Sequence, residues 1–269
     1  MATHRQLYQL NREPFSKDIP SSNAFPSTDF VECTKRLDYL ARIRGLALFT
    51  AAPGFGKSFA LRAFAEKQNQ NITRVIYVHM TTLTTMEFYR QLSMLLGLQA
   101  GARKTDMFHA IREHIEYLND AKHIHPMIII DEAQYLNAEV FRDLKMLLNF
   151  DYDSTDRLSM VLAGQPMLAD LLSRQVHEAL RQRIVINYAF GGITLAEAKE
   201  YAERMLTAAG GSPQLFDESA LGAAYNGSGG SIMVFGQILS NALMIGAANE
   251  ALSIDAEMVM AAANEIAIR

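Results

Sequence analysis

Short apolar runs alternate with amphipathic stretches along residues 45–190 of the chain. Five runs have the length and the hydrophobic density of buried strands. They cover residues 45–51, 75–80, 127–130, 158–163 and 184–186. Because helical patterns separate most of these runs, the order of elements predicts an α/β fold with a five-stranded, mostly parallel sheet.

Apolar residues recur at helical spacing between the runs. The predicted helices cover residues 59–67, 88–96, 107–118 and a stretch that begins after Asn137. In the last of these, Val140, Phe141 and Leu144 follow the helical period, and an asparagine just before such a pattern is a favoured N-cap. We therefore expect Asn137 to start that helix.

Strand patterns stop at Gly191-Gly192, and only helical patterns follow. Four side chains of the kind that caps helices precede them, namely Thr194, Asp217, Ser231 and Asp255. Residues 191–269 are therefore expected to form a separate helical lid domain.

The first 30 residues show no sustained period. They hold three of the seven prolines of the chain, Pro14, Pro20 and Pro26, and such a segment is expected to cross the surface as an irregular strap. The predicted organisation is an α/β domain over 1–190, which includes this strap, followed by the helical domain over 191–269.

Composition narrows the class of protein. The chain has 269 residues, 49% of them hydrophobic and 20% charged, which suffices for a buried core. A net charge of −4 excludes a basic surface overall, so any binding to nucleic acid must be local. Cys33 is the only cysteine and no run approaches about 20 apolar residues, so we expect no internal disulfide, no membrane span and a cytoplasmic protein.

A glycine-rich sequence lies between the first predicted strand and a predicted helix. It reads Ala51-Ala52-Pro53-Gly54-Phe55-Gly56-Lys57-Ser58, a P-loop in which Ala51 replaces the usual first glycine. Its glycines allow backbone N–H groups to surround an anion, the lysine can reach the β- and γ-phosphates, and the serine hydroxyl can bind Mg²⁺. The residues expected to bind the nucleotide are Pro53, Gly54, Phe55, Gly56, Lys57, Ser58 and Phe59.

Two adjacent acids, Asp131 and Glu132, follow the predicted strand at 127–130. An aspartate at the end of a buried strand can hold Mg²⁺ through water, and a glutamate beside it can activate the water that attacks the γ-phosphate. Because a P-loop kinase would not need Glu132 there, the pair predicts hydrolysis of a nucleoside triphosphate.

Further polar residues stand near the last two predicted strands. Gln165 follows the run at 158–163 and is a candidate sensor of the γ-phosphate, with an ordinary turn glutamine as the alternative. Arg181 and Arg183 precede the run at 184–186. In a ring or filament, an arginine here can reach the γ-phosphate of the neighbouring subunit. Arg183 is the favoured finger, Arg181 the second candidate, and a solvated basic turn the alternative.

The order of P-loop, Asp-Glu pair, polar sensor, paired arginines and helical lid resembles that of the AAA+ ATPases. Within them the chain resembles the group of ExeA-type secretion ATPases and transposition ATPases of the TnsC, TniB, IstB and MuB kind. The segments that carry this resemblance are Leu10-Asn11-Arg12-Glu13-Pro14-Phe15, Ala163-Gly164-Gln165-Pro166 and Leu180-Arg181-Gln182-Arg183. It implies ATP and Mg²⁺ as ligands and a homo-oligomer as the working state.

Two departures from the ExeA type favour the transposition branch. ExeA-type lids carry a Gly-Ile-Pro-Arg string, whereas this lid reads Gly229-Gly230-Ser231-Ile232-Met233, and the ExeA type continues into a membrane helix. The resemblance then implies a regulator that oligomerises on double-stranded DNA and recruits or activates a transposase, with ATP hydrolysis driving disassembly. The alternatives are an ExeA-like ATPase that acts on a protein partner, and a nucleotide-gated scaffold without appreciable turnover.

DNA contacts would have to come from Lys or Arg in a few loops, because cations neutralise phosphates. Arg103 and Lys104 lie in a polar break between the predicted helices at 88–96 and 107–118 and are the best pair, with a solvated turn as the alternative. A second basic cluster precedes the P-loop strand and could equally be an outer surface or a subunit interface. It consists of Lys35, Arg36, Arg42 and Arg44.

Overall fold

The computed structural model describes residues 3–16, 19–79, 82–150 and 155–266. Its contacts divide the chain into two compact units. The α/β unit holds residues 31–51 and 57–190, and the helical unit holds residues 1–30, 52–56 and 191–269.

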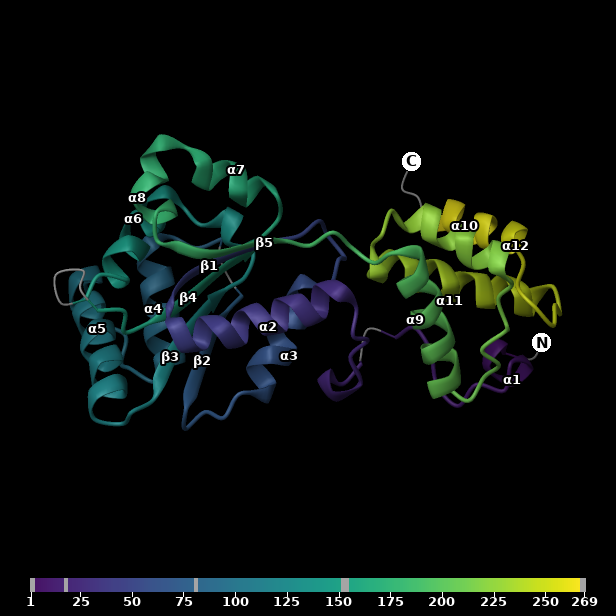
Figure 1. Ribbon diagram of the computed structural model, residues 1–269, viewed down its shortest axis with the longest axis horizontal. Coiled ribbons are helices and arrows are strands. Elements are labelled where there is room, and N and C mark those ends of the chain that lie inside the picture. Colours follow the sequence, from purple (N-terminus) through teal and green to yellow (C-terminus); the bar gives the residue numbers. More distant parts are fainter. Residues whose placement is uncertain (1–2, 17–18, 80–81, 151–154, 267–269) are drawn as a thin grey trace. The chain divides into compact units, whose positions relative to one another are not determined.

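A five-stranded parallel sheet forms the centre of the α/β unit (Figure 1). Its strands are β1 (Gly45–Thr50), β2 (Thr73–Val78), β3 (His125–Ile130), β4 (Ser159–Gly164) and β5 (Ile184–Ala189). Their order in the sheet is β2-β3-β4-β1-β5, and every pairing between them is parallel. The predicted parallel sheet is confirmed, and all five carboxyl ends lie along one edge of it.

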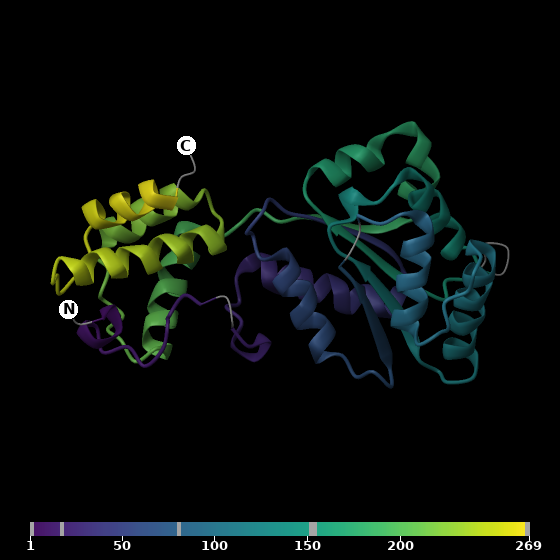
Figure 2. The same cartoon turned by 180° about the vertical axis from the view of Figure 1, so that it is seen from behind.

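Helices cover both faces of this sheet, which explains why its central strands are apolar throughout. Alternate strand residues, such as Leu48, Ile128 and Leu162, pack in one core with helices of one face. Those helices are α4 (Thr85–Leu96), α5 (Lys104–Asp120), α6 (Ala138–Leu147), α7 (Met167–Ser173) and α8 (Glu178–Arg181). Figure 2 shows α4 and α5 next to each other, and they are in extensive contact.

The helix α2 (Thr28–Ile43) crosses in front of the strands in Figure 1. Its Leu40 carbonyl accepts a hydrogen bond of 3.1 Å from the Ser159 hydroxyl of β4. The P-loop helix α3 (Lys57–Lys67) completes the long helices of this unit, and two short 3-10 helices, η2 (Ala133–Tyr135) and η4 (Gln175–His177), lie in its connections.

Strand bounds differ from the predicted ones where pairing overrides the apolar pattern. The run at 75–80 becomes β2 at Thr73–Val78, because that strand pairs residue by residue with β3 from Thr73 to Val78. Met80, which ends the predicted run, lies outside the described residues. The run at 184–186 extends to Ala189, because β5 is an edge strand whose outer positions are exposed and whose apolar signal is therefore short.

The helical unit consists of α1 (His4–Leu7), η1 (Ser21–Asn23), α9 (Leu195–Ala208), α10 (Glu218–Ser228), α11 (Ile232–Ala248) and α12 (Ala256–Ile266). All four predicted caps accept a backbone N–H of the first turn, at distances from 2.6 to 3.3 Å. The predicted helices of the lid are thus confirmed, with their starts. Within the described part of the chain, no helix is long and apolar enough to cross a membrane.

The N-terminal strap packs with the helical unit rather than with the α/β domain to which the sequence assigned it. Tyr8, Leu10, Phe15 and Phe25 are buried in the same core as α9 to α12. The ring of Phe15 lies 6.1 Å from that of Tyr201 in α9. These aromatic and aliphatic side chains, spaced without a period, bury apolar surface that the helices leave open.

A buried histidine links three elements of the α/β unit. His125 of β3 is 8% exposed, and its Nε2 lies 2.8 Å from the Ser159 hydroxyl, which itself donates to Leu40 of α2. Burial, aided by the charge of Arg44, lowers the pKa of His125 to about 4. The folded state therefore favours the neutral ring.

This histidine predicts a loss of stability on acidification. A folded-state pKa below the unfolded value of about 6.5 means that the unfolded chain binds the proton first, so stability is present above pH 6.5 and falls as the pH approaches 4. Between pH 7 and pH 5 the wild type should lose about 2 kcal/mol more unfolding free energy than His125→Gln in urea titrations. The matched variant of the exposed His109, His109→Gln, should keep the wild-type pH dependence, and equal slopes for all three proteins would contradict the prediction.

Candidate nucleotide site

Residues from three neighbouring strands meet at the carboxyl edge of the sheet. Lys57 and Ser58 begin α3 after β1, Asp131 and Glu132 follow β3, and Gln165 follows β4. Because the sheet order places β3, β4 and β1 side by side, these side chains come together although up to 108 residues separate them in sequence. Ligand sites of open parallel sheets form at this edge.

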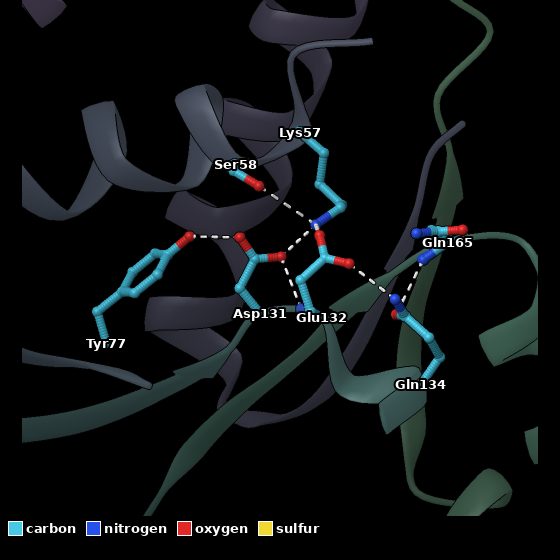
Figure 3. Close-up of polar contacts among 7 residues, drawn as sticks. All are labelled: Lys57, Ser58, Tyr77, Asp131, Glu132, Gln134 and Gln165. Atoms are coloured by element: carbon cyan, nitrogen blue, oxygen red, sulfur yellow. Dashed lines mark hydrogen bonds and ion pairs between the residues drawn. The ribbon is translucent and has the colours of Figure 1, made fainter. Parts of the chain in front are cut away.

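The ammonium group of Lys57 lies between two carboxylates (Figure 3). The side chain is 5% exposed, and its Nζ forms an ion pair with Asp131 and a second one, of 3.3 Å, with Oε1 of Glu132. Nζ also lies 3.4 Å from the Ser58 hydroxyl. A buried cation thus marks the place where phosphates and a metal ion would compete with it.

Asp131 is held as a carboxylate from two sides. Burial by itself would raise its pKa, but the Lys57 ammonium and hydrogen bonds from Ser58 and Tyr77 outweigh that effect and lower the pKa of Asp131. The Tyr77 hydroxyl of β2 donates to Asp131 Oδ2 at 2.7 Å. Burial and the nearby Asp131 charge raise the pKa of Tyr77, so this phenol remains a hydrogen-bond donor.

Glu132 occupies a turn that its own backbone makes unusual. Its φ of 53° and ψ of 36° are left-handed, and its N–H donates to Asp131 Oδ1 at 2.9 Å. The carboxylate is bound at both oxygens, since Lys57 lies at Oε1 and the Gln134 amide donates to Oε2 at 2.7 Å. The left-handed turn directs the Glu132 carboxylate towards Lys57 rather than along the strand (Figure 3).

The glycines of the P-loop adopt the backbone that the sequence required of them. Gly54 and Gly56 have φ values of 81° and 89°, whereas Ala51 has no positive φ, so the departure at Ala51 causes no strain. Within the helical unit, the Gly54 carbonyl accepts a hydrogen bond of 3.2 Å from the Met233 N–H at the start of α11. Methionine thus stands next to the P-loop in the string where ExeA-type lids carry arginine.

The other predicted nucleotide-binding residues lie as follows. Pro53 is exposed, and the Phe55 ring lies so close to Gly192 that a Cβ there would be 2.9 Å from it. Phe59 is on α3, where the Arg62 guanidinium lies 5.4 Å from its ring centroid. Their roles in binding remain predictions.

Magnesium fits the donors that the α/β unit brings together. The Ser58 hydroxyl and the Asp131 carboxylate are hard oxygen donors, the kind that Mg²⁺ prefers, and the cluster already holds a cation in the form of Lys57. Ser58 and Asp131 are the residues that would hold the ion, the aspartate through water.

The two candidate fingers lie at the opposite edge of the sheet. Arg183 immediately precedes β5, whose first residue, Ile184, pairs with Leu46 near the start of β1. The parallel strands place this end roughly 15 Å or more from the P-loop end. Arg181 lies on α8, where its guanidinium donates to the Ser173 carbonyl at 2.5 Å. Neither arginine is placed at the nucleotide site of its own chain.

Arg103 and Lys104 have different environments at the start of α5. Arg103 is exposed, whereas the Lys104 ammonium is bound within the chain by α6, 2.8 Å from Glu139 and 2.7 Å from Asp143. A phosphate would have to displace two carboxylates to bind Lys104. Of the predicted pair, Arg103 is the one that the fold leaves more accessible to DNA.

Two polar residues of the site were not singled out from the sequence. Tyr77 lies on a predicted strand, where an aromatic residue is ordinary. Gln134 follows Glu132 by two residues in Asp131-Glu132-Ala133-Gln134, and this proximity is the only signal that could have identified it. Both are found only through the contacts that the folded strands create.

The parallel sheet, the P-loop and the Asp-Glu pair at one sheet edge define a P-loop NTPase. Residues 41–172 match the family described as the AAA domain, and the chain belongs to the AAA+ ATPases. The class that the sequence resembled is therefore confirmed.

Two characterised relatives represent both branches of the expected group. The chain is 27% identical over 244 residues to General secretion pathway protein A of Aeromonas hydrophila, which covers 90% of this chain and 44% of the relative. It is 26% identical over 149 residues to ATP-dependent target DNA activator B of Escherichia phage Mu, which covers 55% of this chain and 44% of the relative. The chain spans less than half the length of each.

A solved structure shares the fold across the chain. Cdc6p of Pyrobaculum aerophilum superposes with a TM-score of 0.72 over 95% of this chain and 72% of its own, at 16% identity. The likeness extends over the sheet and the helical lid.

Proposed function

We propose that this protein is an ATP-dependent DNA-binding regulator that oligomerises on double-stranded DNA and recruits or activates a transposase. The observation that carries the ATP-dependent part is the cluster of Lys57, Asp131 and Glu132 at the carboxyl edge of the sheet. The DNA-dependent part rests on the similarity to a target DNA activator and on the accessible Arg103. Hydrolysis would drive disassembly of the oligomer.

The residues of the site divide the work of hydrolysis among them. The triphosphate draws the Lys57 ammonium away from the two carboxylates, because the phosphates carry more negative charge. Asp131 and Ser58 are then available to the metal ion, which neutralises phosphate charge when bound. Glu132, released at Oε1, accepts a proton from the attacking water.

Arg183 would complete the site of a neighbouring subunit. Its place at the amino end of β5 excludes contact with the phosphates bound by the same chain, since the strand separates the two. A finger supplied by the neighbour neutralises charge in the transition state and couples turnover to assembly. This role supports a homo-oligomer as the working state.

Filter binding with duplex DNA tests the proposal. DNA retention should require a non-hydrolysable ATP analogue and should fall as salt increases, because phosphate contacts release counterions. Arg103→Ala should weaken binding and reduce the slope of log K against log salt by about 1 for each DNA phosphate that the arginine neutralises. Its thermal stability should match that of the wild type, because Arg103 is exposed.

Lys104→Ala is the matched control in the same experiment. It leaves the Glu139 and Asp143 carboxylates without their cation, so it should lower the melting temperature, while the salt slope stays that of the wild type. DNA binding that ignores ATP, or an Arg103→Ala protein with an unchanged slope, would count against the proposed surface.

A second candidate function follows from the longer of the two matches. General secretion pathway protein A aligns with 90% of the chain, including the lid, whereas the target DNA activator aligns with 55%. An ATPase that acts on a protein partner in secretion or envelope assembly would hydrolyse ATP at the same site. It would show no ATP-dependent retention of duplex DNA at any salt concentration.

A further inference from the structure

Gln134 is a buried amide at the nucleotide site that the proposed hydrolysis does not yet use. It lies in η2, directly after the turn of Glu132, and is 6% exposed. Its Nε2 donates to Glu132 Oε2 at 2.7 Å, and its Oε1 accepts from the backbone N–H of Gln165 at 3.1 Å (Figure 3). One side chain therefore joins the carboxylate after β3 to the backbone after β4.

The two partners fix the orientation of this amide. A backbone N–H can only donate, so it requires the amide oxygen, and a carboxylate can only accept, so it requires the amide nitrogen. The opposite orientation would lose both hydrogen bonds inside the protein, where unmade bonds are costly. The amide is thus a directional link between Glu132 and the end of β4.

The backbone of β4 leaves space for this link. A Cβ on Gly164 would lie 2.3 Å from Gln134 Oε1 and 2.9 Å from Leu168 Cδ2. Gly164 does not have a positive φ, so its lack of a side chain, rather than its backbone conformation, is what the structure uses here. The glycine lets the amide approach the N–H of the next residue.

Holding one oxygen of Glu132 matters because the other must meet water. The Oε1 atom is bound by Lys57 in this state and becomes available when phosphates take the lysine, while Oε2 remains on Gln134. An unsupported glutamate would then rotate freely and lose the geometry that proton transfer needs, and a displacement of about 1 Å can cost about 10²-fold in rate.

We infer that Gln134 is a positioning residue that holds the Glu132 carboxylate for hydrolysis and ties it to the backbone at the end of β4. This inference rests on the proposed role of Glu132 as the base. It also explains how a change at the Gln165 turn, where a γ-phosphate sensor is predicted, would reach the carboxylate through one hydrogen-bonded side chain.

Gln134→Leu and Gln134→Glu test the inference in the full-length protein. Leucine has a similar size and loses both hydrogen bonds, whereas glutamate can still accept from Gln165 but replaces the donor to Glu132 with a second carboxylate. Both variants should lower kcat roughly 10- to 100-fold. The Kd for a non-hydrolysable ATP analogue should stay within about threefold of the wild type. If only the bond to Gln165 matters, Gln134→Glu will keep the wild-type kcat, which would overturn the inference.

A double-mutant cycle shows whether Gln134 acts through Glu132. Added to Glu132→Gln, the change Gln134→Leu should reduce kcat no further, because no carboxylate remains to be held. A general defect of the fold would instead multiply the two losses. Independent, multiplicative effects would therefore contradict the positioning role.

Gly164→Ala supplies a second route if Gln134→Leu does not fold. Its methyl group should displace the Gln134 amide and lower kcat into the same range, again without loss in the Glu132→Gln background. If Glu132→Gln itself keeps wild-type turnover, the proposed base is wrong. If Glu132→Gln is slow while the Gln134 and Gly164 variants keep full kcat, only the present inference fails.

Discussion

Arg183→Ala subunits are expected to bind ATP normally and to hydrolyse it about 10³-fold more slowly than the wild type. The arginine lies at the amino edge of the sheet, whereas Lys57 and Glu132 lie at the carboxyl edge, so its loss leaves the site of the same chain intact. The missing interaction is the one with a neighbour's γ-phosphate. ATP-dependent oligomers should weaken too, which size-exclusion chromatography with a non-hydrolysable analogue would measure.

Mixing two inactive proteins gives the sharper test of this shared site. Lys57→Ala subunits lack the phosphate-binding lysine but keep the finger, and Arg183→Ala subunits keep the lysine but lack the finger. An interface that pairs an Arg183→Ala site with a Lys57→Ala neighbour has all the groups, so the mixture should recover part of the activity. A mixture that stays inactive although both variants co-assemble with the wild type would make Arg181 the next candidate.

Glu132→Gln is expected to bind ATP and to hydrolyse it at least about 10²-fold more slowly. The amide keeps the size of the side chain and cannot accept the proton of the attacking water. Binding should persist because Lys57, Ser58 and Asp131 are unchanged, and the amide removes one of the carboxylates that compete for the lysine. Phosphate release under saturating ATP measures the rate, and a fluorescent analogue measures affinity.

The same substitution at an exposed glutamate controls for the loss of a negative charge. Glu113 lies on the exposed side of α5, and Glu113→Gln should keep wild-type turnover. Wild-type turnover in Glu132→Gln would show that another group activates water, and the scaffold alternative would be supported if the wild type itself released no phosphate.

The P-loop and the Asp-Glu pair were predictable because each is a continuous stretch of sequence. Gly54 and Gly56 need positive φ values, which glycine adopts without strain, and the structure gives them those values. Helix starts were equally local. Asn137 accepts the Val140 N–H at 2.9 Å, since an N-cap bonds only to residues two or three positions away.

The bounds of strands depended on partners that the local pattern does not contain. The edge strand β5 extends three residues beyond its apolar run, because pairing with β1 continues to Ala189. In the same way, the strap lacks a period but contributes Phe15 and Phe25 to the lid core. Burial of apolar surface decides such contacts, and it acts between residues distant in the chain.

Charge alone did not separate the two basic residues of the α4–α5 turn. Both Arg103 and Lys104 stand in a polar break, but only Lys104 meets Glu139 and Asp143, which α6 brings from more than 30 residues away. An ion pair of this kind depends on how helices pack over the sheet and leaves no trace in local composition.

The sequence by itself determined the class of this protein, the parallel sheet, the helical lid and the identity of Lys57, Asp131 and Glu132, because short-range periodicity and backbone requirements encode them. Only the tertiary structure decided the strand order β2-β3-β4-β1-β5. That order places the end of β4 next to the end of β3 and lets Gln134 bridge Glu132 and Gln165. Hydrogen bonds of this kind depend on the distance between atoms in space, which spacing along the chain does not specify.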